Sequence, residues 1–286
     1  MKKTLLSSFI FFIIFSFTVH PQNKGHLVII GGGDKPSYIM QKIVDFAGGP
    51  NSKIIVIPNA SSDPIGSAEY NVEEFKNLGC TNVDYILFSR EEANDHSLVE
   101  KLTGATGIFF SGGDQAFLTR DMLGTKLLDK VYEIYNNGGV ISGTSAGAAV
   151  MSELMITGNE LINKDTTDIF ISIQKNNVEV REGFGFVKTA FIDQHFIKRK
   201  RLNRSISIVL ENPALLGIGI DESTCIIVNP DENFEVLGEN QVIVFDGSEC
   251  SEIKEDKNGN LGAKNLRMHI LLSGDKFDIK NKEVIE

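Results

Sequence analysis

From Leu27 to Ile141, short runs of Val, Ile and Phe alternate with longer amphipathic stretches. Runs of this kind predict strands, and the longer stretches predict helices. Strands that are apolar on both faces need cover on both faces, which the helical crossovers between parallel strands provide. The pattern therefore predicts an α/β fold, a three-layer α/β/α sandwich with a mostly parallel sheet.

The positions of these runs predict the individual elements. Strands are expected at 27–30, 53–57, 83–88, 107–110 and 139–141, and helices at 38–47, 68–78, 91–102 and within 115–136. Later in the chain we expect a strand within 183–196, a helix at 198–210, several short strands within 215–245 and a last strand near 269–272. The hairpin-like succession of the late strands predicts antiparallel strands added at the edge of the sheet.

The amino-terminal segment differs from the rest of the chain in composition. Lys2 and Lys3 precede an apolar run, which predicts a signal peptide over residues 1–22 and hence export to the periplasm or out of the cell. The rival interpretation is a transmembrane anchor, but a spanning helix needs roughly 20 apolar residues and this run is shorter. Because no Pro- or Ser-rich linker follows, residues 23–286 are expected to form a single catalytic α/β domain.

Charge and cysteine content narrow the range of partners. The formal net charge of −10 becomes −12 when the two lysines of the leader are removed. An acidic protein of this kind is not expected to bind nucleic acid or an anionic membrane surface. Cys80, Cys225 and Cys250 lack the spacing of a metal site, so we expect small buried hydrophobes with one optional disulfide, and no metal or organic cofactor.

The strand at 139–141 leads into a turn of small residues around Ser145. Gly143 and Gly147 flank the serine in a Gly-x-Ser-x-Gly pattern. In a nucleophile elbow, side chains at the two flanking positions would collide with strand or helix, and the N–H of the next residue, here Ala146, donates to a developing oxyanion. A plain packing turn is the alternative, whereas a phosphate-binding Walker loop is excluded because Gly-Lys-Ser/Thr is absent.

A serine hydroxyl is a weak nucleophile near neutral pH and needs a base. Of the five histidines, His195 ends an apolar strand, which is expected to deliver it to the same sheet edge as Ser145. A carboxylate should fix the tautomer of the imidazole. Spacing alone does not choose among the acids near these two residues, which are Glu153, Glu160, Asp165, Asp168 and Asp193.

A second Gly-rich loop, 111–115, follows the neighbouring strand. Its exposed backbone N–H groups are suited to complete an oxyanion hole. The alternative is a plain turn in which Asp114 caps the following helix.

Directly after His195, five of the seven residues from Lys198 to Arg204 are basic. At helical spacing Arg201 and Arg204 share one side, with Arg199 beside them. Guanidinium groups placed in this way are suited to hold the carboxylates of an acidic substrate, although such a run is often only a solvated helix face.

Together these motifs resemble the cyanophycinases, in the serine peptidase family that also holds the aspartyl dipeptidases. The resemblance extends from about Val28 to Val228 and rests on 112–115, 143–148, 193–196, 217–224 and the three arginines. It implies a fold similar to class I glutamine amidotransferases, with serine in place of their cysteine. It also implies hydrolysis of cyanophycin, a polyaspartate that carries arginine on its side-chain carboxyls, to β-Asp-Arg dipeptides.

The resemblance further implies roles for the matched residues. Ser145 becomes the nucleophile, His195 the base and Glu160 the acid of a triad, while the N–H groups of Gly113 and Ala146 form the oxyanion hole. The positions expected to contact substrate are Gln115, Asp193, Gln194, Arg199, Arg201 and Arg204.

The expected partner is therefore an acidic peptide or polymer, and the sequence leaves a homodimer open. Two other functions also stay open. One is a dipeptidase for Asp-containing dipeptides, and the other is a non-catalytic binding protein of the same fold.

Overall fold

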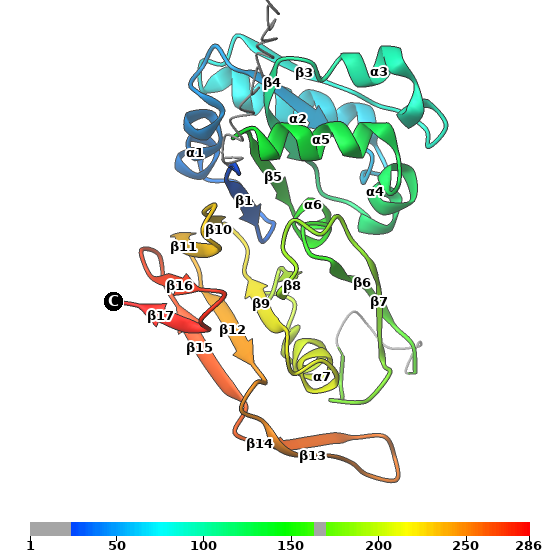
Figure 1. Ribbon diagram of the computed structural model, residues 1–286, viewed down its shortest axis with the longest axis vertical. Coiled ribbons are helices and arrows are strands. Elements are labelled where there is room, and N and C mark those ends of the chain that lie inside the picture. The colour runs from blue at the N-terminus through cyan, green and yellow to red at the C-terminus, as the bar shows by residue number, and fades with distance from the viewer. Residues whose placement is uncertain (1–23, 163–169) are drawn as a thin grey trace, which may run out of the picture.

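Strands and helices alternate through the first half of the molecule, as the sequence predicts (Figure 1). The computed structural model describes residues 24–162 and 170–286, so the expected signal peptide and the candidate acids Asp165 and Asp168 lie outside the described residues. The elements of this half are β1 Leu27–Ile30, α1 Ser37–Ala47, β2 Lys53–Ile57, α2 Pro64–Asn77, β3 Asn82–Tyr85, the 3-10 turn η1 Glu92–Asn94, α3 His96–Glu100, β4 Ala105–Phe110, α4 Gln115–Met122, α5 Lys126–Asn136, β5 Val140–Thr144 and α6 Ala146–Ala149.

A nine-stranded sheet forms the centre of the fold, in the order β17-β16-β11-β10-β1-β5-β4-β2-β3. Within the row β1-β5-β4-β2-β3, each strand is parallel to the next. On its other side, β1 pairs antiparallel with β10. The antiparallel strands on that side are β10 Thr224–Val228, β11 Asn233–Gly238, β16 Lys276–Asp278 and β17 Glu283–Ile285.

Apolar side chains leave both faces of this sheet and explain why both are covered. Val28 and Ile30 pack with residues of α1 and α2 on one face, whereas Ile29 packs with residues of α4 and α5 on the other. Successive side chains of a strand point to opposite faces, so the all-apolar strand requires helices on both. The predicted α/β fold, with parallel central strands, covering helices and antiparallel edge strands, is thereby confirmed.

One part of the predicted topology is wrong, because several late strands form a sheet of their own. In it β15 Arg267–Leu271, β12 Val242–Asp246, β9 Leu216–Ile220 and β8 Ala190–Gln194 lie side by side in that order. Strand β10 joins the main sheet although it follows β9 closely. The turn at 221–223, in which Ser223 has a φ of 53°, redirects the chain between the two sheets.

The remaining elements lie around this second sheet (Figure 1). Helix α7 Leu202–Glu211 contacts β9 and β12, while β6 Leu154–Glu160 pairs with β7 Val178–Glu182 and β13 Ser251–Glu255 with β14 Leu261–Lys264. Helix α7 begins later than predicted, because residues 196–201 turn back on the end of β8, with the Arg201 N–H donating to the Phe196 carbonyl at 3.0 Å.

The cysteines and the membrane question can be answered for the described part of the chain. Cys80 and Cys225 are buried, as expected of small hydrophobes, and Cys250 is partly exposed. All three thiols are free, so the optional disulfide is not formed. Within residues 24–162 and 170–286, no helix has the length and apolar character needed to cross a bilayer.

Candidate active site

The turn at Ser145 has the tight geometry that its composition predicts. Ser145 stands between β5 and α6 with φ 53° and ψ −109°. A Cβ on Gly143 would lie 2.5 Å from the Gly147 carbonyl oxygen, and a Cβ on Gly147 would lie 2.3 Å from the carbonyl oxygen of Phe110. Only glycine fits at these two positions, which is the steric requirement of a nucleophile elbow.

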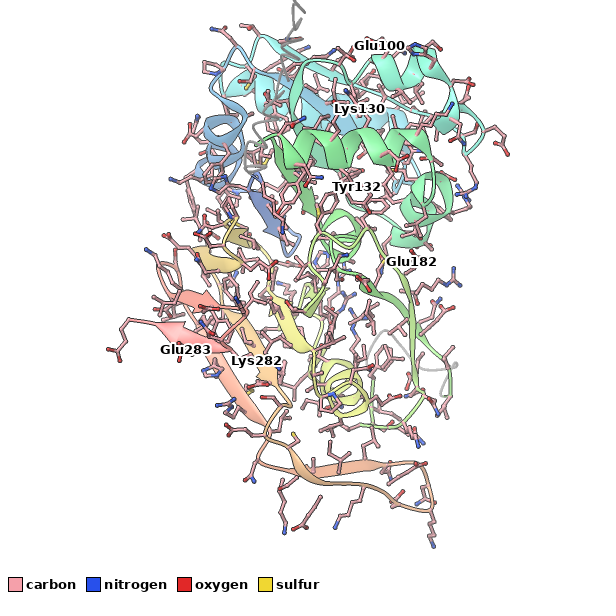
Figure 2. All side chains as sticks on the ribbon, in the orientation of Figure 1. Glu100, Lys130, Tyr132, Glu182, Lys282 and Glu283 are labelled. Carbon is pink, nitrogen blue, oxygen red and sulfur yellow. The ribbon has the colours of Figure 1, made fainter. Side chains whose placement is uncertain are left out.

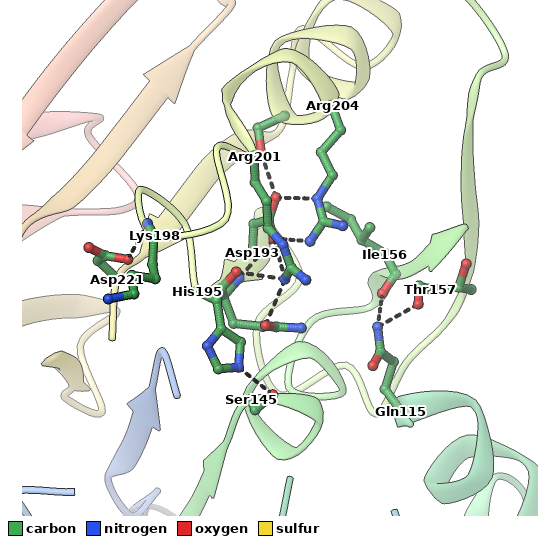
Figure 3. Close-up of polar contacts among 12 residues, drawn as sticks. Gln115, Ser145, Ile156, Thr157, Asp193, His195, Lys198, Arg201, Arg204 and Asp221 are labelled. Atoms are coloured by element: carbon green, nitrogen blue, oxygen red, sulfur yellow. Dashed lines mark hydrogen bonds and ion pairs between the residues drawn. The ribbon is translucent and has the colours of Figure 1, made fainter. Parts of the chain in front are cut away.

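The imidazole of His195 lies against this serine (Figure 3). Its Nε2 is 2.9 Å from the Ser145 Oγ, within hydrogen-bond distance. The sequence suggested that His195 comes from the same sheet as Ser145. The structure shows that it follows the last residue of β8 and therefore comes from the second sheet. The missing side chain of Gly32 makes room for the ring, since a Cβ there would lie 2.3 Å from Cε1 of the imidazole.

The carboxylate that contacts the imidazole is Glu222, and the choice of Glu160 is not supported by the geometry. Glu222 Oε1 lies 2.7 Å from Nδ1 of His195. Glu160, at the end of β6, instead accepts a hydrogen bond from the Asn177 side chain at 2.6 Å. Strand β6 pairs with β7, and there Glu160 lies opposite Val178.

Glu222 lies in the loop after β9, and the sequence contained a signal for it. The loop follows a fully buried strand and belongs to the 217–224 motif on which the family resemblance partly rests. Its backbone is fixed by the Asn240 side chain, which donates to the Glu222 carbonyl at 2.8 Å. Glu222 follows His195 in the chain, outside the segment between Ser145 and His195 that contains the acids considered from the sequence.

Three successive carbonyls at the end of β1 hold the three functional segments together. The Ile30 carbonyl accepts from the Ser145 N–H at 3.1 Å, the Gly31 carbonyl from the His195 N–H at 2.7 Å, and the Gly32 carbonyl from the Ser223 N–H at 2.9 Å. The end of one strand thus orders the serine, the histidine and the loop that carries Glu222.

The environment of His195 favours the neutral imidazole. Burial lowers the pKa of His195 below its ordinary 6.5, the hydrogen bond to Glu222 acts in the opposite direction, and Arg199 and Arg201 lower the pKa further. A neutral ring near pH 7 with Nδ1 directed at a carboxylate leaves Nε2 free to accept the serine proton.

The Gly-rich loop 111–115 lies beside Ser145. A Cβ on Gly112 would be 3.4 Å from the Ser145 Cβ, and Gly113, with φ 140°, packs so tightly that a Cβ would lie 2.0 Å from the Ala60 carbonyl oxygen. The Asp114 side chain caps α4 by accepting from the Ala116 N–H at 2.8 Å. The capping role that the sequence offered as an alternative is therefore confirmed, and the same loop also lies next to the serine.

Two of the three candidate arginines are buried around Asp193 (Figure 3). Arg204 forms a bidentate ion pair with Asp193, which has a fully buried side chain and also accepts from the Ser205 hydroxyl at 2.9 Å. Burial alone would raise the pKa of Asp193, but Arg204 and Arg201 hold it below its ordinary value. Because its side chain has no exposed surface and is paired inside the fold, the geometry does not support the direct substrate contact that the resemblance implied for Asp193.

The other predicted contact residues also have intramolecular partners. Arg201 donates from Nη1 to the carbonyl and the side-chain oxygen of Gln194, both at 2.7 Å. The Gln115 amide donates to the carbonyls of Ile156 and Thr157 at 2.7 and 2.8 Å. Arg199 differs from the two buried arginines, because its side chain is exposed on the turn that follows His195.

A serine hydroxyl within hydrogen-bond distance of an imidazole that also contacts a carboxylate, at the end of an α/β sheet, is the arrangement of a serine hydrolase. The profile of Peptidase family S51 matches residues 27–236. A cyanophycinase from Synechococcus elongatus is 34% identical over 276 residues, which cover 93% of this chain and 82% of that protein. A cyanophycinase from Geminocystis herdmanii is 32% identical over 91% of this chain and 96% of its own length.

The chain therefore belongs to peptidase family S51 and is a serine-type peptidase. The crystal structure of a peptidase from an acI-B1 Actinobacterium has the same fold, with a TM-score of 0.68 over 90% of this chain and 98% of the other, at 22% identity.

Proposed function

We propose that this protein is an exported peptidase that hydrolyses cyanophycin to β-Asp-Arg dipeptides through Ser145, His195 and Glu222. The observation that carries the proposal is the continuous hydrogen-bonded row from the Ser145 Oγ through both ring nitrogens of His195 to the Glu222 carboxylate, at 2.9 and 2.7 Å. The cyanophycinases that resemble this chain over most of its length support the choice of substrate.

The proposed reaction begins with attack of the Ser145 Oγ on the scissile carbonyl carbon while Nε2 of His195 takes the hydroxyl proton. Glu222 holds the other ring nitrogen and stabilises the imidazolium that forms. The proton then passes to the leaving amine nitrogen, which departs and leaves an acyl-enzyme. Water, deprotonated by His195, attacks the ester and releases the acid product together with free serine.

The oxyanion of each tetrahedral intermediate needs donors beside the serine. The N–H of Ala146 opens α6 and so has no intrahelical acceptor. Gly113 lies in the loop that packs against Ser145, where its N–H supplies the second donor in this proposal. Two backbone donors are the usual composition of such a hole, and each contributes about 10²- to 10³-fold to turnover.

The cluster beside the site suits an acidic backbone. Arg199 is exposed and sits on the turn that begins at His195, so it is the arginine placed to meet a carboxylate in solvent. Arg201 and Arg204 act from below the surface, where their ion pairs with Asp193 fix the turn and the end of β8. We therefore assign direct contact to Arg199 and a positioning role to the buried pair.

The test is hydrolysis of purified cyanophycin by the protein lacking residues 1–22, with the products separated by chromatography and identified by mass. We expect β-Asp-Arg to appear, to vanish with Ser145→Ala, and to persist with Ser67→Ala on α2. Turnover of α-Asp dipeptides without release from the polymer would favour the dipeptidase. If no peptide is cleaved but cyanophycin is bound, the binding-protein interpretation holds.

Export rests on the sequence of residues 1–22 and needs its own test. The full chain, expressed in a Gram-negative host, should lose its leader and appear in the periplasm or medium, whereas a chain lacking residues 2–22 should stay in the cytoplasm. Recovery of the full chain, still carrying Lys2 and Lys3, from the cytoplasm would refute export.

A further inference from the structure

A cavity lies at the end of β1 opposite to the serine. Its volume is about 680 Å³, and its walls come from the start of β1, from α5, from the 183–189 loop and from the turn after β10. Leu27, the first residue of β1, lines it, whereas Ser145 and His195 bond to carbonyls at the other end of that strand. The volume lies in the range of small-molecule sites in proteins.

Aromatic rings form one wall of this cavity. Phe186 packs against Tyr132 and Tyr135, with ring centroids 5.1 and 5.3 Å apart. The Tyr132 hydroxyl donates to the Phe184 carbonyl. Tyr135 is only 7% exposed, and within the described part of the chain its hydroxyl makes no hydrogen bond. The hydroxyl of a buried residue that lines a cavity, and that has no partner among the described residues, is a donor and acceptor available to a ligand.

Carboxylates stand around the aromatic wall. Glu153, Glu182 and Glu232 line the cavity together with Lys24 and Lys188. The lysines lie 3.7 Å from Glu232 and 3.9 Å from Glu153, in long and solvated pairs. Glu182 makes no ion pair with any residue that the structure describes. Figure 2 shows Glu182 at the start of the loop that faces Tyr132 on α5.

Burial and the nearby carboxylates both raise the pKa of Tyr132 and of Tyr135. Burial, and then Glu232, raises the pKa of Tyr135 to about 12. Burial, and then Glu182, raises the pKa of Tyr132. Both hydroxyls therefore stay protonated at physiological pH. Three carboxylates against two lysines leave the charged lining of the cavity net negative.

We propose that this cavity is a second binding site, separate from the serine, for a guanidinium group such as an arginyl side chain. A planar guanidinium stacks on aromatic rings and pairs with a carboxylate through parallel N–H donors, and this wall offers both partners in Phe186, the tyrosines and Glu182. The cavity alone defines the chemistry of the ligand. The expectation that the arginyl group comes from cyanophycin or its product rests on the proposed function.

Binding is tested with Nα-acetyl-L-arginine amide, by calorimetry and by tyrosine emission. The chain has no Trp and only five Tyr, so ligand contact with Tyr132 and Tyr135 alters a large part of the signal. We expect saturable binding that Glu182→Gln weakens about tenfold and Tyr135→Phe weakens by a smaller factor. The matched control, Glu69→Gln on α2, should bind as the native protein does.

A neutral probe of the same shape, Nα-acetyl-L-citrulline amide, distinguishes recognition of the charge from nonspecific binding. It should bind at least tenfold more weakly than the arginine amide. Equal binding of the two probes, equal binding by Glu182→Gln, or no saturable binding would each overturn the proposal. None of these binding measurements needs turnover. The binding-site proposal can therefore be refuted while the peptidase proposal stands, and the peptidase proposal can be refuted while the binding site stands.

Two further arms identify the source of the guanidinium group. If the polymer supplies it, Glu182→Gln should raise KM for long cyanophycin chains and leave KM for a trimer of β-Asp-Arg unchanged. If the released product supplies it, β-Asp-Arg should bind Ser145→Ala protein and lose that affinity in the Ser145→Ala, Glu182→Gln double variant. Either result supports the site, and failure of both arms counts against it.

Discussion

Replacing Glu222 by Gln tests the assignment of the acid most directly. The carboxylate lies 2.7 Å from Nδ1 of His195 and its side chain is 24% exposed, so water screens the contact only in part. A hydrogen bond to a charged group contributes about 1.5–3 kcal/mol, or roughly 10- to 150-fold in rate. The amide can also donate to Nδ1 and thereby impose the tautomer in which Nε2 carries the proton, which extends the expected loss of kcat to about 10²- to 10⁴-fold.

The matched control is Glu160→Gln, which changes the acid chosen from the sequence in the same way. Glu160 bonds Asn177 in the β6–β7 pair, so we expect kcat within about twofold of the native value. Both variants are compared by initial rates of β-Asp-Arg release, with thermal unfolding as a check on folding. A large loss with Glu160→Gln and none with Glu222→Gln would refute the reasoning.

The pH profile gives an independent reading of the same contact. Only neutral His195 accepts the serine proton, so kcat/KM falls as the pH drops through the pKa of this residue. Burial sets that pKa below 6.5, and activity should therefore persist at pH values where an ordinary histidine is charged. Because Glu222 acts to raise the pKa, Glu222→Gln should move the acidic limb to still lower pH, and a shift to higher pH would contradict the assignment.

Three further changes test the support around the site. Gly32→Ala and Gly49→Ala both place a Cβ at positive φ, but only the Cβ at position 32 meets the imidazole, at 2.3 Å. Activity should therefore fall by about 10²-fold or more in Gly32→Ala and remain unchanged in Gly49→Ala. Asp193→Asn leaves Arg204 buried without its carboxylate and should lower the free energy of unfolding by about 3–5 kcal/mol in urea titrations, with a change below ~1 kcal/mol counting against it. Arg199→Ala should raise KM for cyanophycin about tenfold at unchanged Tm, whereas an unchanged KM would remove this arginine from the substrate site.

Local patterns were sufficient to predict the central elements and the serine turn. The all-apolar strands in the first half and the paired glycines around Ser145 follow from sterics and burial that act within a few residues. Elimination among the five histidines and the place of His195 at the end of an apolar strand predict that it meets Ser145, and the structure brings the two side chains together. The sheet to which that strand belongs depends on pairing between distant segments, which no local pattern reports.

The acid and the arginines show where local patterns fail. Glu222 reaches the imidazole because the turn at 221–223 passes between two sheets, and this crossing was not expected. Arg201 and Arg204 share a side, as helical spacing predicts. Both are nevertheless buried, because they form ion pairs with Asp193 on β8. The charge pattern alone could not distinguish a buried ion-pair cluster from an exposed anion-binding surface.

The backbone at the end of β1 explains how Ser145, His195 and Glu222 are held in contact. Ser145, His195 and Ser223 have φ values of 53°, 48° and 53°, a region that costs a non-glycine residue about 1–3 kcal/mol. Each of the three donates its N–H to one of three consecutive carbonyls, from Ile30 to Gly32. Since these bonds come from the end of a buried strand in the middle of the main sheet, the strained conformations are held by the centre of the fold. Ser145, His195 and Glu222 therefore keep their spacing through a shared strand end, so the fold itself sets the hydrogen-bonded row that the proposed function uses.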